Sequence, residues 1–217
     1  MSHPVWPLYD LSVVTPRVEL RSLDDDLGTQ LALLAARGVH DPSWMPFYIP
    51  WTDYPSPELE RNAMQFYWRC RADFSPASWN LHFAVFEDGE LVGTTTIIGN
   101  QFPALRSFET GSWLGLAHQG RGIGKEMRQA TLHFGFAGLG GQWATTGAFT
   151  DNAASLGVTR NLGYRETGHR RAVRRDEPAT ILTFEMSRSD WESNLRRDDI
   201  EIRGLEACLP FFGLSDG

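Results

Sequence analysis

Hydrophobic and polar positions alternate near the start of the chain and predict a first strand over residues 13–21. Val18 and Leu20 fall on one side of it and the charged residues around them on the other, which is the two-residue period of a half-buried strand. An apolar stripe at helical spacing follows and predicts a helix. Ser22 or Asp24 offers the N-cap of that helix.

Residues 40–56 interrupt both periods. They contain four prolines and five aromatic side chains, so we expect a packed, irregular loop there. Two interpretations of this loop remain open: a satellite cluster of the core, or one wall of a binding cleft. A serine cap, a first-turn proline and a first-turn acid at 56–58 then predict a helix that runs to about Ala72.

Two strands at 81–87 and 90–97 are predicted to form a hairpin, because the Asp-Gly pair between them suits a type I′ turn. A further strand is predicted over 108–114. It leads into a glycine-rich loop and then into an amphipathic helix over about 124–136.

The remaining elements are predicted from the same two periods. They are a strand over 142–149, a helix over 153–161 and a strand pair, 164–174 and 179–186, around a turn at 175–178. Antiparallel neighbours early in the chain and strand–helix–strand crossovers later indicate an α/β protein with one mixed sheet.

We expect one domain over 1–217, with a C-terminal extension from about residue 188. The tail at 199–215 is largely apolar. It could dock on its own domain or on another subunit, and the second arrangement would give a homo-oligomer.

Composition narrows the classes of function. Of the 217 residues, 41% are hydrophobic and 22% charged, as in ordinary globular proteins. The net charge of -7 would repel phosphate backbones, so no nucleic-acid partner is expected. No apolar run reaches the roughly 18 residues of a membrane helix, and the first ten residues lack the features of a secretory signal. The two cysteines have no metal-type spacing. We therefore expect a cytoplasmic protein with no membrane partner and no metal.

The glycine-rich segment 113–125 is the most informative part of the sequence. Its glycines let consecutive N–H groups converge, and the following helix adds free amides and the positive end of its dipole. Such a site suits phosphate or pyrophosphate. A Walker loop is excluded, because Gln119 stands where its first glycine belongs and Glu126 follows the lysine. A dinucleotide fingerprint fails because Lys125 replaces its last glycine.

The hexapeptide QGRGIG at 119–124 resembles the pyrophosphate loop of the GNAT superfamily of N-acyltransferases. The family's second motif, N-x-x-S followed by L-G-F or L-G-Y, is matched at 152–155 and 162–164 with the same spacing. The segments TPRVELR and ETGSWL resemble the RimJ/RimL branch, whose members acylate protein N-termini and diverse small amines. The resemblance covers about residues 13–187.

This resemblance implies an α/β fold of the α+β type, with a single mixed, mostly antiparallel sheet, a splayed strand pair and flanking helices. It implies transfer of an acyl group from acyl-CoA to a primary amine of a protein N-terminus, a lysine or a small molecule, by direct attack in a ternary complex. Acetyl-CoA is the expected donor. A dicarboxylic acyl-CoA such as succinyl-CoA is the alternative, because the arginines of 169–175 could attract an anionic acyl group; an exposed edge strand is the plainer interpretation of those arginines. A non-catalytic acyl-CoA sensor and a protein that keeps only the fold are the competing functions.

The resemblance also assigns the coenzyme contacts. The strand end before the loop is expected to bulge and to free backbone amides for pantetheine and for the acyl oxygen, the latter bound by Leu114. Asn152 is expected to bond to the pantetheine amide, with a plain helix cap as its alternative. The full set is Trp113, Leu114, Gly115, Gln119, Gly120, Arg121, Gly122, Ile123, Gly124, Lys125, Asn152 and Ser155.

Glu109 is the candidate general base, directly or through water, because it begins the strand that ends at the expected bulge. A surface or ion-paired carboxylate is its alternative role. The weaker candidates for the base are His82, His118 and Asp41.

Many relatives carry a tyrosine as the catalytic acid at the position of Thr159. Because this chain lacks that tyrosine, Ser155 is the replacement, either as the acid or as a coenzyme contact. The strand after this motif often carries a glutamate in the same branch, and here it is basic instead.

The acceptor site is expected to be formed by the loop and helix at 40–70, opposite the coenzyme. Aromatic side chains can hold amines by cation–π contact. The candidate lining residues are Phe47, Tyr48, Trp51 and Tyr67.

Overall fold

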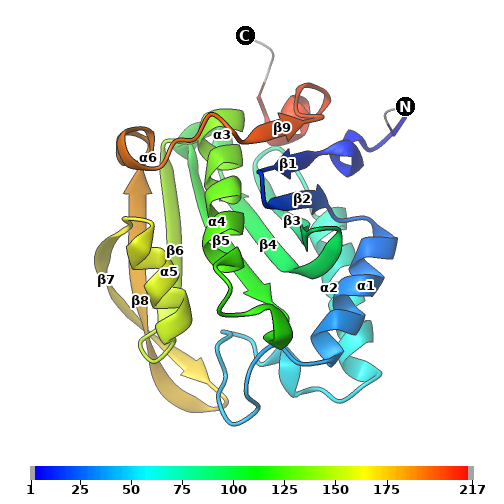
Figure 1. Cartoon of the computed structure of the whole chain (residues 1–217), viewed down its shortest axis with the longest axis vertical. Coiled ribbons are helices and arrows are strands. Elements are labelled where there is room, and N and C mark those ends of the chain that lie inside the picture. The colour runs from blue at the N-terminus through cyan, green and yellow to red at the C-terminus, as the bar shows by residue number, and fades with distance from the viewer. Residues whose placement is uncertain (1–2, 215–217) are drawn as a thin grey trace.

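The computed structural model describes residues 3–214, and its strands join in one sheet of nine in the order β7-β8-β6-β5-β4-β3-β2-β1-β9 (Figure 1). The strands are β1 (Ser12–Val14), β2 (Val18–Ser22), β3 (Ser78–Glu87), β4 (Glu90–Asn100), β5 (Ser107–Leu114), β6 (Trp143–Phe149), β7 (Arg165–Arg174), β8 (Glu177–Ser187) and β9 (Glu201–Arg203). The ends of the expected domain, residues 1–2 and 215–217, lie outside the described part.

Helices and short helical turns connect these strands. The helices are α1 (Asp25–Ala36), α2 (Glu58–Ala72), α3 (Phe102–Leu105), α4 (Ile123–His133), α5 (Ala153–Asn161) and α6 (Arg188–Asn194). The turns are η1 (Pro7–Asp10), η2 (Trp51–Asp53), η3 (Leu116–His118), η4 (Phe134–Gly138) and η5 (Glu206–Phe212).

Every neighbouring pair of strands is antiparallel except β5 and β6. These two run parallel and pair only over residues 107–109 and 143–145. Beyond that point β5 stays with β4 and β6 stays with β8, so a gap opens between β5 and β6. The mixed, mostly antiparallel sheet with a splayed pair is thereby confirmed.

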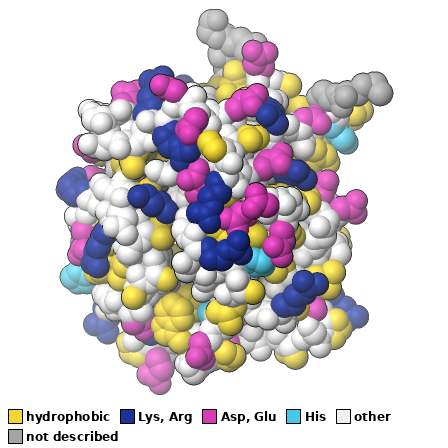
Figure 2. Space-filling model, viewed as in Figure 1, with side chains coloured by type: hydrophobic (Ala, Val, Ile, Leu, Met, Phe, Trp, Pro, Cys, Tyr) yellow, Lys and Arg dark blue, Asp and Glu magenta, His cyan; other side chains and the backbone are white. Residues whose placement is uncertain are grey.

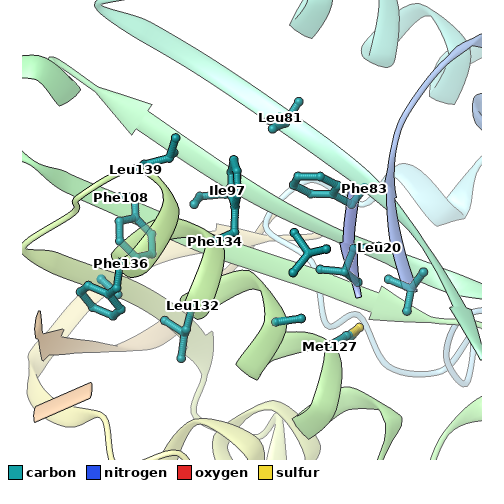
Figure 3. Close-up of a cluster of buried hydrophobic side chains, with 14 of the residues drawn as sticks. Leu20, Leu81, Phe83, Ile97, Phe108, Met127, Leu132, Phe134, Phe136 and Leu139 are labelled. Carbon is teal, nitrogen blue, oxygen red and sulfur yellow. The ribbon is translucent and has the colours of Figure 1, made fainter. Parts of the chain in front are cut away.

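The main core lies between one face of the sheet and α4. Figure 3 shows this cluster, in which Phe83, Ile97 and Phe108 of the sheet lie with Met127 and Leu132 of α4. Each such side chain contributes roughly 1.5–3 kcal/mol when it is fully buried. A smaller cluster packs α1 and α2 on the opposite face of the sheet.

The first predicted strand is a hairpin. Pro16 and Arg17 separate β1 from β2, and the turn is closed by the N–H of Thr15, which donates to the Val18 carbonyl at 2.9 Å. A single strand over 13–21 is therefore wrong, although the burial of Val18 and Leu20 on one side is confirmed. A proline has no N–H for a ladder, which is why the chain turns here.

Two predicted helix starts have different outcomes. Asp24 caps α1 by accepting a hydrogen bond from the N–H of Leu27 at 2.8 Å, which confirms one of the two candidate caps. The cap predicted at Ser56 is wrong: α2 begins at Glu58, and the Ser56 hydroxyl donates to the Glu60 carboxylate at 2.6 Å.

The Asp-Gly hairpin turn between β3 and β4 is confirmed, with positive φ at both Asp88 and Gly89. The turn between β7 and β8 is shorter than predicted. Arg175 and Asp176 alone have positive φ, while Glu177 already belongs to β8.

The C-terminal tail docks on its own domain. β9 pairs with β1, beside which it lies in Figure 1. The turn η5 buries Cys208 and Phe212 in the main core. The apolar side chains of the tail are thus used within the chain, and self-association through them stays a prediction. No helix in the described residues is long and apolar enough to span a membrane.

Candidate active site

The glycine-rich loop connects the end of β5 to α4 by way of η3. Gly120 and Gly122 have φ of 75° and 81°, a region that glycine enters at no steric cost. In the part of the chain that the structure describes, nothing accepts a hydrogen bond from the N–H groups of Gly120, Arg121 or Gly122. α4 then begins without a side-chain cap. The loop therefore presents a run of free N–H groups at the positive end of a helix dipole.

Side chains of the loop brace it rather than face this run of amides. The Gln119 amide donates to the carbonyl oxygens of Val39 (2.7 Å) and Leu114 (2.9 Å). Arg121 donates to Glu87 at 2.7 Å. Ile123 is fully buried in the core, and Lys125 is exposed on the first turn of α4.

Glu87 organises this brace from the end of β3. It is 5% exposed and accepts bonds from both Arg17 (2.8 Å) and Arg121. Arg17 in turn donates to the Arg121 carbonyl at 2.8 Å. These two ion pairs partly neutralise the positive charge of the arginines at the loop. Basic and acidic side chains are intermixed on the face seen in Figure 2.

The strand that leads into the loop is regular to its end. β5 keeps an unbroken register with β4 through Leu114, so the predicted bulge is wrong. Free amides arise instead because β6 has left the other edge of β5. The N–H of Gly115 donates to the Val92 carbonyl on the β4 side. Alternate residues of a strand direct their N–H groups to opposite edges, so those of Ser112 and Leu114 face the gap.

α5 supplies the second predicted motif, beside the end of β6. Asn152 is 8% exposed and caps α5, its side-chain oxygen accepting from the Ser155 N–H at 3.0 Å. The cap role is thereby shown, and contact of the Asn152 amide nitrogen with pantetheine stays a prediction. Thr159 is buried. Ser155 lies half-buried on the first turn.

One buried arginine was not singled out from the sequence. Arg128 of α4 is 5% exposed and reaches the point where β5 and β6 part. It donates to the hydroxyls of Thr110 (2.7 Å) and Ser112 (3.2 Å) on β5 and of Thr146 (3.3 Å) on β6. A signal was present: Arg128 stands beside Met127 and three residues before Thr131, on the buried side of the helix.

A cleft of about 250 Å³ opens on the opposite face of the sheet from α4. Glu109, Tyr48 and Arg170 face one another in it. Burial raises the pKa of Glu109, and the charge of Arg170 opposes that rise. The lining residues are Tyr48, Glu109, Thr145, Thr146, Gly147, Thr167, Arg170, Thr183, Phe184 and Glu185.

Tyr48 is held over β6 by close packing. A Cβ atom on Gly147 would lie 2.8 Å from the Tyr48 hydroxyl, so a side chain at this position would displace that hydroxyl. The Arg170 guanidinium lies 4.9 Å from the centre of the ring. Burial raises the pKa of the Tyr48 hydroxyl, so it stays protonated at neutral pH.

The other predicted acceptor residues divide into two groups. Phe47 and Trp51 pack beside Trp113, with ring centres 5.2 Å apart for Phe47 and Trp51 and 5.9 Å apart for Trp51 and Trp113. The loop 40–56 is thus both a satellite cluster and a wall of the cleft. Tyr67 does not line the cleft. It lies on α2 with its side chain buried, and its ring centre is 5.2 Å from that of His82.

The weaker candidates for the base lie outside the cleft. Burial lowers the pKa of His82 to about 4. His118 is buried in η3, 3.9 Å from Glu90. Exposed Asp41 accepts bonds from the N–H and hydroxyl of Ser43, which lower its pKa. Glu109 is therefore the one predicted base that borders the cleft.

The arginines of the edge strand β7 have separate roles. Arg174 forms a two-bond pair with Asp151 at 2.8 Å, and Arg175 at the turn pairs with Asp53. These pairs tie the hairpin to the loops around the cleft. Of Arg170, Arg174 and Arg175, Arg170 alone faces the cleft. Among residues 3–214 no group of three or more His, Cys, Asp or Glu side chains could hold a metal ion.

The chain is similar to known proteins in both sequence and structure. The family model of the acetyltransferase (GNAT) domain matches residues 17–165. A GNAT-family protein from Chromobacterium violaceum superposes with a TM-score of 0.68 at 20% identity, over 83% of this chain and 88% of that one. RimL, the ribosomal L7/L12 α-N-protein acetyltransferase, in complex with coenzyme A gives 0.62 at 18%, over 80% and 96%.

A third similar structure is the spermidine/spermine N-acetyltransferase SpeG from Vibrio cholerae. Its TM-score is 0.63 at 15% identity, over 83% of this chain and 99% of that one. At these identities the structural likenesses show a common fold, and they include RimL, in agreement with the branch that the sequence resembles.

Proposed function

This chain belongs to the GNAT acetyltransferase family of N-acyltransferase enzymes, and we propose that it transfers an acetyl group from acetyl-CoA to a primary amine bound in the cleft around Glu109. One observation carries the proposal. The free N–H groups of the glycine loop lie at one end of the gap between β5 and β6, and Glu109 lies where that gap closes.

The residues present fit a coenzyme A diphosphate. The N–H groups of Gly120 and Gly122 are free, and the uncapped start of α4 adds its own amides, so main-chain donors and a helix dipole would meet the negative charge. Exposed Lys125 adds a mobile positive charge on the same turn. The brace around Glu87 keeps the loop in this shape.

The open edge of β5 would bind the rest of the coenzyme. Beyond Glu109 its outward N–H groups lack a partner strand, although the carbonyls of Thr110 and Leu114 accept from Thr146 and Gln119. An extended pantetheine arm can therefore take the place of β6 by accepting from these N–H groups. The N–H of Ser112 would then donate to the acyl oxygen, where negative charge develops as the amine attacks, and the N–H of Leu114, nearer the glycine loop, would bond to the arm itself. Holding the two reactants together supplies much of the rate enhancement.

Glu109 would accept the proton of the amine, directly or through water. A lysine amine with its ordinary pKa near 10.4 must be deprotonated at a cost of about 4.6 kcal/mol at pH 7, whereas an α-amine near 8 costs about 1.4 kcal/mol. The raised pKa of Glu109 makes its carboxylate a stronger base than an exposed one, which suits the first class of acceptor in particular. Ser155 remains the proposed contact or acid on the α5 side.

The identity of donor and acceptor belongs to the proposal as well. Acetyl-CoA is the donor expected from the family. Arg170 is the one arginine of 169–175 that faces the cleft without an ion pair, within the described residues, so succinyl-CoA is the alternative donor to test. RimL acetylates a protein α-amine and SpeG a polyamine, and both acceptor types enter the test.

Calorimetric titration with acetyl-CoA and succinyl-CoA tests the first half of the proposal. Release of free thiol, measured with a peptide α-amine, lysine and spermidine as acceptors, tests the second half. We expect saturable binding of acetyl-CoA and amine-dependent thiol release. Binding without turnover on any amine would favour the sensor function, and absence of binding would overturn both.

A further inference from the structure

Arg128 occupies an unusual position for a charged side chain. Its side chain extends from α4 toward the face of the sheet that borders the main core, at the point where β5 and β6 separate. It is 5% exposed. Its terminal nitrogens bridge the two strands, bonding to Thr110 and Ser112 on one and to Thr146 on the other.

The charge of Arg128 is uncompensated within residues 3–214. Its three partners are neutral hydroxyls, no carboxylate forms an ion pair with it, and its Nε lies buried without a hydrogen-bond partner. The hydroxyl of Tyr164, which also contacts Thr110 at 3.3 Å, is neutral too. A buried cation with neutral neighbours is costly unless an anion joins it.

The distance along β5 indicates which anion that is. From Leu114, where the glycine loop begins, back to Thr110 the strand covers about 13 Å. This is comparable to an extended pantetheine arm laid along the open edge of β5. An arm whose diphosphate lies in the loop therefore ends with its sulfur beside Thr110 and the guanidinium of Arg128.

We propose that Arg128 stabilises the thiolate of coenzyme A as it leaves, in place of the acid tyrosine that this chain lacks at Thr159. This inference rests on the proposed function. In the transfer, the amine nitrogen bonds to the acyl carbon and the carbon–sulfur bond breaks. The electron pair of that bond goes to sulfur, next to the guanidinium, and the amine proton goes to Glu109 or to water. No proton need reach the sulfur before the product leaves.

The test uses coenzyme A itself and requires no acceptor. Thiolate absorbs in the ultraviolet and thiol does not, so a pH titration of the bound coenzyme reports the pKa of its thiol. A nearby cation lowers a thiol pKa. We expect the wild-type protein to lower it by about 1–3 units relative to free coenzyme A, and Arg128→Met to abolish most of that shift. Desulfo-coenzyme A should bind equally well to both proteins.

Arg188→Met is the matched control. Arg188 is a partly buried arginine on α6 that donates to the Phe136 carbonyl at 2.8 Å, away from the gap, and its loss should leave the shift intact. Arg128→Lys keeps a charge with a different shape and should retain part of the shift. It also provides a second variant should the methionine variant not fold.

Each outcome decides. A thiol pKa in the wild-type complex equal to that of free coenzyme A overturns the role of Arg128 and leaves the proposed function standing. A lowered pKa that persists in Arg128→Met assigns the shift to other groups and makes Arg128 a clamp between two strands. If the wild-type protein binds no coenzyme A, the proposed function fails first, and this inference fails with it.

Discussion

The two sides of the candidate active site are built from different material. The proposed coenzyme side would use main-chain N–H groups of one continuous segment, from the end of β5 through the glycine loop into α4. The acceptor side uses side chains from the loop 40–56, β5, β6, β7 and β8, which are far apart in the sequence.

This difference separates recognition of the coenzyme, which can be common to many reactions, from selection of the acceptor, which is specific to one. Backbone donors recognise a diphosphate whatever acyl group follows it, so the coenzyme side can stay the same while the reaction partner changes. Side chains such as Tyr48, on an irregular loop, and Arg170, on an edge strand, would determine the shape and charge around the proposed amine. If the two sides are separable, a substitution on one side should leave the property of the other unchanged. The variants that test this follow from the largest expected effect to the smallest.

Gly122→Glu should abolish binding of coenzyme A. The new side chain would start 3.2 Å from Arg17 in a positive-φ position, and its carboxylate would face the diphosphate. Two like charges about 4 Å apart at a protein surface repel by about 4 kcal/mol, which corresponds to roughly a thousandfold in Kd. Calorimetry measures the loss.

The control for that variant is Gly163→Glu. Gly163 also has positive φ, at 79°, and nothing lies near its missing Cβ, so the backbone strain is matched without the charge at the loop. Unchanged affinity in Gly122→Glu would refute the assignment of the loop.

Glu109→Gln should lower kcat by about 10²- to 10⁴-fold while leaving the Kd of coenzyme A unchanged. The carboxylate is the active form of a base, so wild-type activity should rise with pH through the pKa of Glu109, which burial places above its usual value. A pH–rate profile and a coenzyme titration measure the two effects. Surface residue Glu166 serves as the control in Glu166→Gln. An equal loss in coenzyme affinity would show that the two sides are not separable.

Glu87→Gln should weaken coenzyme A binding about tenfold, or by about 1.4 kcal/mol, with kcat nearly unchanged. The variant frees Arg17 and Arg121 from their shared carboxylate and so loosens the brace without removing a donor of the loop. Glu19→Gln, which breaks the exposed pair with Arg21, is the control. Tighter binding in Glu87→Gln would show instead that this carboxylate repels the diphosphate.

Arg170→Met should have the smallest effect. The positive charge of Arg170 lowers the pKa of Glu109, so its removal should move the acid side of the pH–rate profile upward by about one unit or less. Arg171→Met, which changes the next residue of the edge strand, is the control. A profile that does not move would show that Arg170 and Glu109 are not coupled in the working enzyme.

The coenzyme side could be predicted well from the sequence because its determinants are local. The glycine positions, the strand before them and the helix after them lie within 107–136, and the structure places all of them as expected except the bulge. The family resemblance implies a bulge as the source of the free amides. They arise instead from β6 leaving β5, which is a property of the whole sheet.

The acceptor side was predicted only in part, because its residues meet through long-range packing. Tyr48 and Glu109 reach the cleft together, but nothing near Arg170 in the sequence tells which of its neighbours faces inward. Tyr67 could have been excluded: Leu59, Ala63 and Tyr67 follow one another at four-residue spacing and so share the buried side of α2. The prediction rests on the aromatic side chain of Tyr67 and does not use this helical spacing.

The pairing of β9 with β1 has a consequence for synthesis of the chain. Residues 12–14 are made well before residues 201–203, which form one of their two neighbouring strands. This edge of β1 thus stays unpaired until residues 201–203 have been made. A premature stop between the segments of the candidate site and β9 would release a product that carries those segments and an unpaired strand edge, the feature by which sheet proteins aggregate.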